Sequence, residues 1–357
     1  MRDRGVVLSL QESEDLSWDA PGCFQVAPDV YRIPLPLPHD GLRAVNVYAI
    51  VDGDRLVLID SGQQLVVARS ALELALRSLN ASLGDISTFF VTHIHRDHYT
   101  QAVAVRREFG NRIYLGDGER ESMNHASHPT GNPLHDQLVE LERCGANALV
   151  ANIKPSSDTE DIAGSLYEEP DGWLREETIE LANRQLRVIA TPGHTRGHVI
   201  FYDDSNRLLF AGDHVLPHIT PSIGFEPLVY PDPLGNYLRS LRRVRHLPDA
   251  YLLPAHGMPG PGFYRRVDEL LAHHDERLGA TEAAVNGGAS SPYEVASVLR
   301  WTRRRRHLVE LDPFNQMLAV METKYHLELL AIQGRLLQSL VAGTYQFKVA
   351  GQTPQRT

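Results

Sequence analysis

The sequence predicts a layered α/β protein with a small unit at its C-terminal end. Strand-like and helix-like segments alternate in two successive halves of the chain, which is typical of α/β layers. Helical segments and a hairpin then follow in a compact series after "NGGAS" (286–290). Because 357 residues exceed one ordinary core, we expect a large domain at 1–275 and a smaller one at 276–357.

The first half opens with a predicted hairpin in "NVYAIVDGDRLVLIDSG" (46–62), where two β-rich runs flank Asp52-Gly53-Asp54. Apolar residues then recur at helical spacing over 65–83, and "ISTFFVT" (86–92) predicts a short buried strand. A helix at about 100–109 and a strand at 112–116 complete this half.

The second half follows a polar stretch. Residues 117–170 are broken by glycine and proline, so we interpret them as an insertion that either covers an active site or forms a surface excursion. Strand patterns return from residue 178 in "TIELA", "LRVIATPG", "HVIFYDD" and "RLLFAGD". A helix (235–247), a strand (250–257) and a long helix (263–285) end the large domain.

The C-terminal unit begins at Ser291-Pro292-Tyr293-Glu294, a capping box with proline at the first helical position. Asp312-Pro313 begins a second helix in the same way, and Gly334 is expected to end a third. Residues 335–350 predict a hairpin that turns at Gly343. Three helices followed by a hairpin is the winged-helix order.

Composition and charge narrow the function classes. A net charge of −10 argues against a protein that binds nucleic acid mainly through its overall charge. The basic run "RRRR" (303–306) is interpreted as a solvated helix end or loop. No run approaches the roughly eighteen apolar residues of a transmembrane helix. Only two cysteines, and an N-terminus without an apolar core, favour a cytoplasmic protein.

The stretch "VTHIHRDHYTQ" (91–101) places His93, His95, Asp97 and His98 directly after a predicted strand. Their spacing fits neither face of a helix, whereas a loop at the exit of a strand can turn all four side chains toward one point. Imidazole and carboxylate are usual ligands of zinc and its neighbours. Four such groups, joined by others, exceed what one tetrahedral zinc ion needs, so the cluster indicates two ions.

Three more metal-competent side chains lie at or just past the ends of predicted strands. They are His194 in "TPGHTRGH" (191–198), Asp213 in "FAGDHVL" and His256 in "LLPAHG". Such folds assemble their sites from separate elements. A single histidine of this kind is usually structural, but the joint pattern favours a metal site.

In this order and at these intervals, "THIHRDH", "PGHTRGH", "AGD" and "PAHG" resemble the motifs of the metallo-β-lactamase fold superfamily, most of all the glyoxalase II-type arrangement. The resemblance spans roughly residues 24–275 and implies an αββα sandwich with up to two metals at one edge. The segments "SPYEVASVLRW" and "METKYHLELLAIQGRL" resemble the winged-helix tail of the β-lactamase-like protein 2 group. One departure is Thr100, where the family commonly has glycine.

Carried over by position, the resemblance implies two metal ions with one shared ligand. His93, His95 and His194 would hold the first ion, Asp97, His98 and His256 the second, and Asp213 would bridge both. Asp60 in "LIDSG" matches a position behind the ligands, where it would orient a ligand imidazole, with a plain turn or helix cap as the alternative. His198 matches a position that is usually not a ligand.

The resemblance implies hydrolysis by a hydroxide that bridges two divalent ions, zinc above all, with manganese or iron as alternatives. Asp97 and Asp213 are the expected catalytic residues, and Asp97 would orient the hydroxide or pass a proton to the leaving group. The expected substrate is a small thioester, ester or lactone, because the negative charge and the insertion suit a closed pocket.

Several alternatives stay open. An endoribonuclease of the β-lactamase-like protein 2 type is suggested by the tail and the run 303–306, and a non-catalytic binding protein is the alternative of a different class. A β-lactamase is disfavoured, because the N-terminal residues show no signal peptide. A persulfide dioxygenase stays an alternative, because it would have the same metal ligands.

The expected partners follow from the same residues. No membrane partner is expected. The tail is expected to pack on the catalytic domain or to form a homodimer contact rather than bind nucleic acid, because 313–333 offers mainly Lys324, His326 and acidic residues. His218, soon after Asp213, is a candidate substrate contact.

Overall fold

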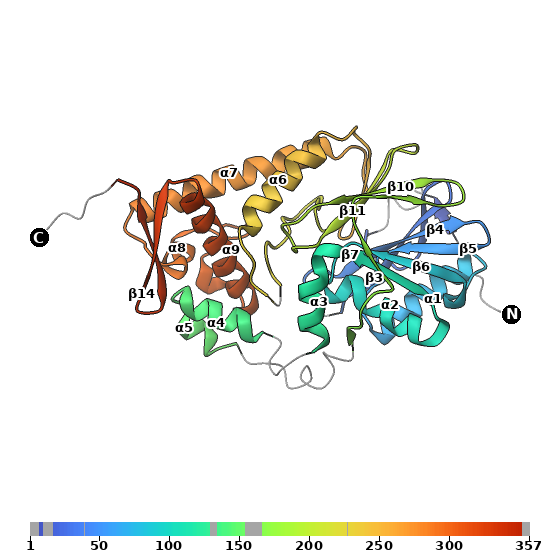
Figure 1. The fold of residues 1–357 in the computed structure, drawn as a ribbon, viewed down its shortest axis with the longest axis horizontal. Helices are drawn as coiled ribbons and strands as arrows, with labels where there is room; N and C mark the ends of the chain where they lie inside the picture. Colours follow the sequence, from blue (N-terminus) through green and yellow to red (C-terminus); the bar gives the residue numbers. More distant parts are fainter. Residues whose placement is uncertain are drawn as a thin grey trace, which may run out of the picture.

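The computed structural model describes residues 7–9, 17–38, 40–128, 134–153, 166–226 and 228–351. Its main body is a pair of stacked sheets with helices on both outer faces (Figure 1). The first sheet has eight strands, and strands that follow one another along the chain are neighbours in the sheet. They are β1 (Val7–Ser9), β2 (Cys23–Ala27), β3 (Val30–Pro36), β4 (Ala44–Asp52), β5 (Arg55–Ile59), β6 (Ile86–Val91), β7 (Arg112–Gly116) and β8 (Gly172–Leu174).

The second sheet has five strands in the spatial order β13, β12, β11, β10, β9. They are β9 (Thr178–Glu180), β10 (Gln185–Ala190), β11 (Val199–Asp203), β12 (Leu208–Gly212) and β13 (Tyr251–Pro254). In β11, Val199 and Phe201 face the first sheet, whereas Ile200 and Tyr202 face the helices on the other side. This alternation is the two-residue period of a strand that is buried on both faces.

The same period in β4 places Val47 and Ala49 against the helices of the first sheet and Tyr48 and Ile50 against the second sheet. Each sheet is therefore covered by helices on one face and by the other sheet on its inner face. This αββα arrangement confirms the predicted fold class. The hairpin predicted at 46–62 is formed by β4 and β5.

Helices α1 and α2 cover the first sheet, and α6 and α7 cover the second. None of the described helices is both long enough and apolar enough to pass through a lipid bilayer. The α-helices are α1 (Val66–Ser78), α2 (Arg96–Phe109), α3 (Arg120–Ser127), α4 (His135–Arg143), α5 (Asn147–Val150), α6 (Pro233–Arg245), α7 (Tyr264–Asn286), α8 (Pro292–Val298) and α9 (Pro313–Ile332).

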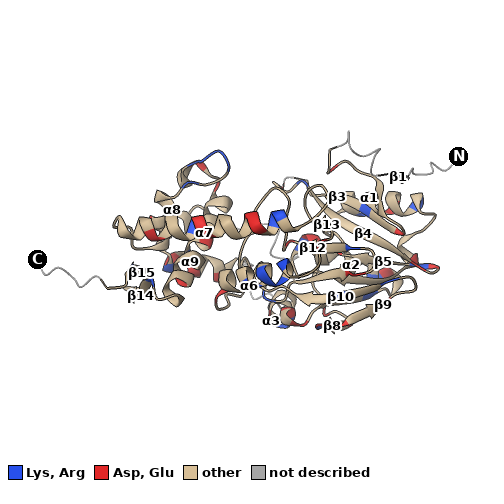
Figure 2. Ribbon diagram, turned by 90° about the horizontal axis from the view of Figure 1, so that it is seen from above, with Lys and Arg blue, Asp and Glu red and all other residues tan. Residues whose placement is uncertain are grey.

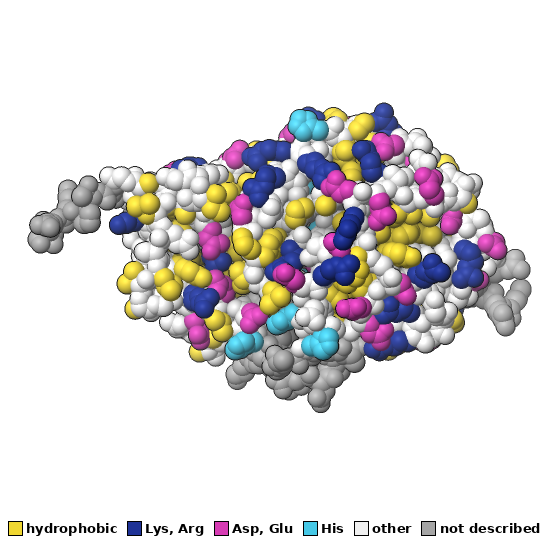
Figure 3. Space-filling view, in the orientation of Figure 1, with side chains coloured by type: hydrophobic (Ala, Val, Ile, Leu, Met, Phe, Trp, Pro, Cys, Tyr) yellow, Lys and Arg dark blue, Asp and Glu magenta, His cyan; other side chains and the backbone are white. Residues whose placement is uncertain are grey.

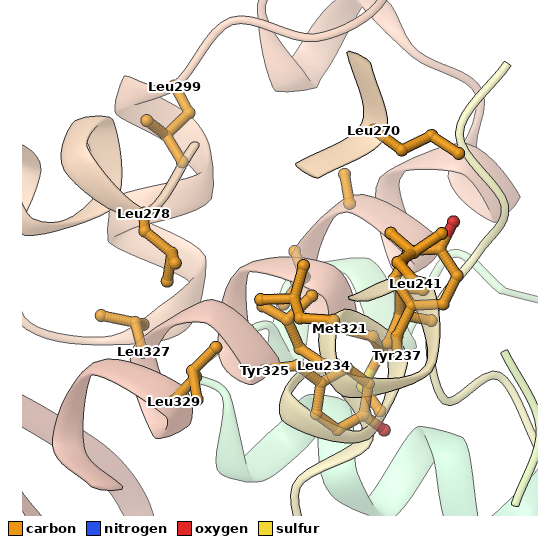
Figure 4. Close-up of a cluster of buried hydrophobic side chains, with 14 of the residues drawn as sticks. Leu234, Tyr237, Leu241, Leu270, Leu278, Leu299, Met321, Tyr325, Leu327 and Leu329 are labelled. Atoms are coloured by element: carbon orange, nitrogen blue, oxygen red, sulfur yellow. The ribbon is translucent and has the colours of Figure 1, made fainter. Parts of the chain in front are cut away.

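The C-terminal unit shares one hydrophobic core with the second sheet. Figure 4 shows side chains of α6, α7 and α9 packed together, among them Leu241, Leu270 and Met321. The boundary expected at residue 275 falls inside α7, which is one continuous helix. Asp312-Pro313 and Gly334 flank a single helix, α9, and not two helices as predicted. The hairpin follows as β14 (Leu336–Val341) and β15 (Thr344–Val349).

The described part of the predicted insertion contains α3, α4 and α5, while 129–133 and 154–165 lie outside the described residues. Helix α4 lies against α9 and the hairpin (Figure 1). The buried Lys324 ammonium of α9 lies 3.2 Å from Glu140 Oε1 of α4, and Tyr345 Oη of β15 donates to the same oxygen at 2.8 Å. These contacts attach the insertion to the C-terminal unit.

The strands that lead into the predicted site residues end at one edge of the sandwich. In the first sheet β5 and β6 are parallel, and in the second sheet β10, β12 and β13 all run the same way. Hydrogen bonds join the two sheets here, from Val199 N to Thr92 O (2.8 Å) and from Asn46 N to Ala255 O (2.7 Å). Chain segments that are far apart in sequence therefore leave their strands at the same place.

Candidate metal centre

The cluster 93–98 spans the junction between β6 and α2. His93 follows the strand, and the main-chain N–H groups of His98 and Tyr99 donate to His95 O at 3.0 Å. Helix α2 therefore begins at Arg96, with Asp97 and His98 in its first turn. The expectation that all four residues lie in a loop, with a helix from about residue 100, is corrected here: an acidic residue in the first turn stabilises a helix, so the helix starts earlier.

Four of the predicted ligands form a first group. His93 Nε2 lies 3.0 Å from His95 Nδ1, and His194 Nε2 lies 3.2 Å and 3.0 Å from these two atoms. Asp213 Oδ2 lies 3.4 Å from His194 Nε2. Three imidazole nitrogens and one carboxylate oxygen thus converge from three segments of the chain, and together they suit a divalent ion of the zinc type.

The other three predicted ligands form a second group beside the first. Asp97 Oδ2 lies 3.5 Å from His98 Nε2 and 3.4 Å from His256 Nε2. The second oxygen of Asp213, Oδ1, lies 3.6 Å from His98 Nε2 and 3.4 Å from His256 Nε2. The Asp213 carboxylate therefore directs one oxygen to each group, which is the grouping expected from the sequence. That these atoms bind metal ions stays a prediction.

Three of the donor atoms are buried and lack hydrogen-bond partners among the described residues, as expected of atoms that bind a cation. His98 Nε2, His256 Nε2 and Asp213 Oδ1 are fully buried and have no hydrogen-bond partner within the described chain. Leaving such a group unsatisfied costs about 1–3 kcal/mol, so buried polar atoms nearly always find a partner. Asp213 Oδ1 lies 3.6 Å and 3.4 Å from the other two atoms, so all three belong to the second group, where a divalent cation would satisfy them.

Hydrogen bonds fix which nitrogen of each ligand imidazole faces the centre. A metal-binding histidine usually donates its other ring N–H to a nearby acceptor, which sets its orientation. Three of the five histidines donate to main-chain oxygens: His95 Nε2 to Phe225 (2.8 Å), His194 Nδ1 to Ser222 (2.6 Å) and His256 Nδ1 to Ala44 (2.7 Å).

Helix α9 supports this shell from outside. The Tyr325 hydroxyl donates to Gly224 O at 3.2 Å, between the carbonyls that hold His194 and His95. The C-terminal unit therefore helps to shape the segment 222–225, on which two of the predicted ligands depend.

Asp60 connects the remaining two histidines. Its Oδ2 accepts a hydrogen bond from His98 Nδ1 at 2.9 Å, and its Oδ1 accepts from the Thr92 main-chain N–H at 2.8 Å and from the Thr92 hydroxyl at 3.0 Å. The hydroxyl in turn lies 3.0 Å from His93 Nδ1. Asp60 also has a φ of 61°, a strained conformation that persists only where the surrounding structure holds it. One buried carboxylate thus orients ligands of both groups.

Replacing Asp60 by asparagine is expected to weaken metal affinity by about 10- to 100-fold, because an amide has a single acceptor oxygen and cannot accept from both His98 Nδ1 and Thr92 as the carboxylate does. Competition titration of the purified variant with a chromophoric chelator measures this change. Asp54→Asn, in the exposed turn between β4 and β5, is the matched control and should bind metal as the unaltered protein does. Equal affinities for all three proteins would show that Asp60 is only a turn residue.

The electrostatics differ between the two groups. Burial lowers the pKa of His95 to about 3, with the neighbouring His194 adding to the effect, so its imidazole is neutral and free to bind a metal. Burial also disfavours a charged His98, but Asp97, Asp60 and Asp213 outweigh it and raise the pKa of His98 to about 10. The second group therefore attracts positive charge, as a cation site does.

Two further histidines have contrasting positions. His198 is fully buried behind the first group: its ring stacks on His93 at 5.0 Å, and its Nε2 accepts from the main-chain N–H of Asp213 at 3.2 Å. It therefore positions Asp213, a role that the sequence motif gave no way to assign. His218 is exposed, and a ring carbon lies 3.9 Å from where a Cβ on Gly257 would stand, beside His256. Its contact with substrate stays a prediction.

Comparisons with known proteins agree with this geometry. A family model described as the metallo-beta-lactamase superfamily matches residues 40–256, more than half of the chain. The "Probable metallo-hydrolase YqjP" of Bacillus subtilis is 24% identical over 335 residues, which cover 90% of this chain and 98% of that protein. An "Atrochrysone carboxyl ACP thioesterase" of Aspergillus fumigatus is 25% identical over 261 residues, which cover 72% of this chain and 65% of that protein.

A solved structure extends the similarity to the C-terminal unit. The metallo-beta-lactamase family protein TTHA1429 from Thermus thermophilus superposes with a TM-score of 0.76 at 27% identity. The match covers 91% of this chain and all of that protein. The two sheets and the helices after them thus form one arrangement shared with this protein.

Proposed function

The chain belongs to the metallo-beta-lactamase superfamily of metallo-hydrolases, and we propose that it hydrolyses small acyl thioesters with two divalent metal ions, most readily zinc. The observation that supports this most directly is the Asp213 carboxylate, which directs one oxygen to each of two ligand groups. Bound there, two such ions would act as Lewis acids and lower the pKa of water toward neutrality. His93, His95 and His194 would hold one ion, and Asp97, His98 and His256 the other.

The residues of the chain set the geometry of this reaction. Asp97 is the most exposed of the carboxylates in the centre, with 19% of its side chain accessible against 8% for Asp213, so it faces an incoming substrate. Burial raises the pKa of Asp97, but His98 and His256 outweigh this and hold its pKa below its ordinary value. Asp97 is therefore a carboxylate at neutral pH, able to orient the attacking water and accept its proton.

The donor set suits a thiolate leaving group. A thiol has a pKa of about 8.5, so a thiolate departs without being protonated, whereas an alkoxide leaving group needs an acid. The metal centre supplies an ionised Asp97 and no protonated carboxyl group among its described ligands. The relative from Aspergillus fumigatus, whose name describes a thioesterase for an acyl-carrier protein, supports the same class of substrate.

Surface charge gives less support to the alternative, cleavage of RNA. Figure 3 shows basic and acidic side chains interspersed on this face of the molecule, with no continuous basic stripe. The net charge of −10 repels a polyanion as a whole. An endoribonuclease is therefore the second interpretation, and a non-catalytic binding protein the third.

One parallel assay tests the proposal. Protein loaded with zinc is given a panel of acyl thioesters, with thiol release followed by a colorimetric reagent, and a labelled single-stranded RNA. We expect thioester hydrolysis that Asp97→Ala reduces by about 100-fold or more and that the turn variant Asp54→Asn leaves unchanged. RNA cleavage alone, abolished by Asp97→Ala, would replace the proposal with a nuclease. No turnover of any substrate by metal-loaded protein would favour a binding protein.

A further inference from the structure

The basic run of the sequence forms a rigid turn, the arginine loop (residues 301–306), between α8 and α9. Figure 2 shows it as a blue loop beyond α8. Trp301 and Arg306 exchange two main-chain hydrogen bonds of 2.8 Å that close the loop. Within it, Arg305 N donates to Thr302 O at 3.0 Å, and both residues have positive φ, 54° and 61°. The loop is thus held in one strained shape, of the kind that proteins keep at functional sites.

Trp301 anchors this turn to the core. It is only 8% exposed, and its indole N–H donates to Ala296 O at 2.8 Å. The guanidinium of Arg277 lies 3.8 Å from the Trp301 ring centre and donates to Arg300 O at 2.9 Å. The arginine side chains therefore project from a fixed base rather than from a flexible segment.

The arginines of the loop are exposed. Other exposed arginines, such as Arg243 and Arg335, form ion pairs with carboxylates. In the described part of the chain, no ion pair joins residues 303–306 to a carboxylate. The acidic side chain of the neighbouring Glu310 instead accepts from the His307 main-chain N–H. The loop is a concentrated positive charge in a protein whose net charge is negative, so any ligand that it bound would be an anion.

The loop is tied to the rim of the metal centre. Arg303 donates from its guanidinium to His218 O, and His218 lies beside Gly257, which follows His256. Arg266 fixes the same rim from α7 by donating to Leu216 O (2.6 Å) and Ile219 O (2.8 Å). The five residues from Asp213 to His218 span at most about 18 Å, so the main chain at His218, which Arg303 contacts, lies within that distance of the main chain at Asp213.

We propose that the arginine loop binds the phosphate of a phosphopantetheine arm whose thioester lies in the metal centre. This inference rests on the proposed thioester hydrolysis and names the class of carrier. A pantetheine arm places its phosphate roughly 15 Å from the thioester carbon, about the length of four or five extended residues, and the upper bound on the rim segment leaves room for an arm of this length. Guanidinium groups bind phosphate oxygens through paired, charge-assisted hydrogen bonds. Coenzyme A and an acyl-carrier protein both present this phosphate.

The test compares one acyl group on three carriers: coenzyme A, pantetheine without phosphate, and a phosphopantetheinylated carrier protein. The double variant Arg304→Gln/Arg305→Gln should lower kcat/KM for the phosphate-bearing thioesters, relative to the phosphate-free one, by about tenfold or more, mainly through KM. The control Arg77→Gln/Arg112→Gln removes the same charge from exposed sites elsewhere and should leave this ratio unchanged. Calorimetry should show weaker binding of coenzyme A to the arginine-loop variant alone. A fall only for the carrier protein would identify the protein-borne arm as the source of the phosphate.

Three outcomes would contradict the inference on the arginine loop or the proposed function, and they can be told apart. Thioester hydrolysis with an unchanged ratio in the arginine-loop variant overturns the inference and leaves the proposed function standing. Loss of RNA binding in that variant with an unchanged thioester ratio assigns the loop to nucleic acid instead. Failure of the unaltered, metal-loaded protein to hydrolyse any of the three thioesters overturns the proposed function itself.

Discussion

Asp213→Ala is expected to lower kcat by about 10³-fold or more, the largest effect of any single substitution in the centre. Its two carboxylate oxygens serve different groups: Oδ2 lies 3.4 Å from His194 Nε2, and Oδ1 lies 3.4 Å from His256 Nε2. No other residue of the two groups contributes to both. Removal of Asp213 would therefore take one ligand atom from each of the two groups that would hold the metal ions. Steady-state kinetics on the thioester found by the assay panel measures the loss.

Matched variants distinguish loss of the Asp213 ligand from a general loss of the folded structure. Asp213→Asn keeps the shape of the side chain but removes its charge, so its kcat should lie between those of the alanine variant and the unaltered protein. His218→Ala changes an exposed residue at the rim and should cost less than about tenfold, as expected where only a surface contact is lost. Metal content should fall in the alanine variant while thermal unfolding stays cooperative. Equal losses in Asp213→Ala and His218→Ala would show that the bridging role is misassigned.

The positions of the predicted ligands could be read from the sequence because they follow strand ends. A buried strand is recognisable by composition, and strands that run the same way in a layered fold open at one edge. His93, Asp213 and His256 each come within two residues of the end of such a strand. The resemblance of these short motifs, in their chain order, to the metallo-β-lactamase superfamily then predicted which side chains meet.

The supporting shell could not be predicted, since most of it is main chain. The carbonyl groups of Phe225, Ser222 and Ala44 fix three imidazoles, and a carbonyl group is the same in every residue. The partners are also distant in sequence; Ala44 and His256 are separated by 212 residues. Asp60 could be proposed because "LIDSG" matches a position behind the ligands in the metallo-β-lactamase superfamily, although a plain turn or helix cap was the alternative.

The predicted helix boundaries were wrong where charged residues, and not the spacing of apolar residues, decide where a helix begins. Helix α2 begins at Arg96, before its apolar period starts, because Asp97 lies in the first turn, where a negative charge is stabilised. Asp312-Pro313 and Gly334 predict the start of one helix and the end of another, yet the 20 residues Pro313–Ile332 form one helix, packed against α7 and α8. The predicted winged-helix class of this unit stays a prediction; the elements present are α7, α8, α9 and the hairpin.

Removal of metal is expected to abolish hydrolysis and to lower thermal stability. His98 Nε2, His256 Nε2 and Asp213 Oδ1 are buried without partners in the described chain, so each costs about 1–3 kcal/mol when no cation satisfies it. A ligand that binds only the folded state at 1,000 times its Kd stabilises that state by about 4 kcal/mol. For a large domain this corresponds to a rise in Tm of roughly 8 °C.

Calorimetry on chelator-treated protein, before and after the return of zinc, manganese or iron, measures this rise, and elemental analysis gives the number of ions per chain. The ion that gives the larger shift and restores turnover is the better candidate for the native metal, because ligand chemistry alone suits all three. Asp213→Ala should show a clearly smaller shift, since it has lost an atom from both groups. The proposal of a catalytic metal centre would be wrong if protein supplemented with metal held fewer than one ion per chain and its Tm did not change when metal was added.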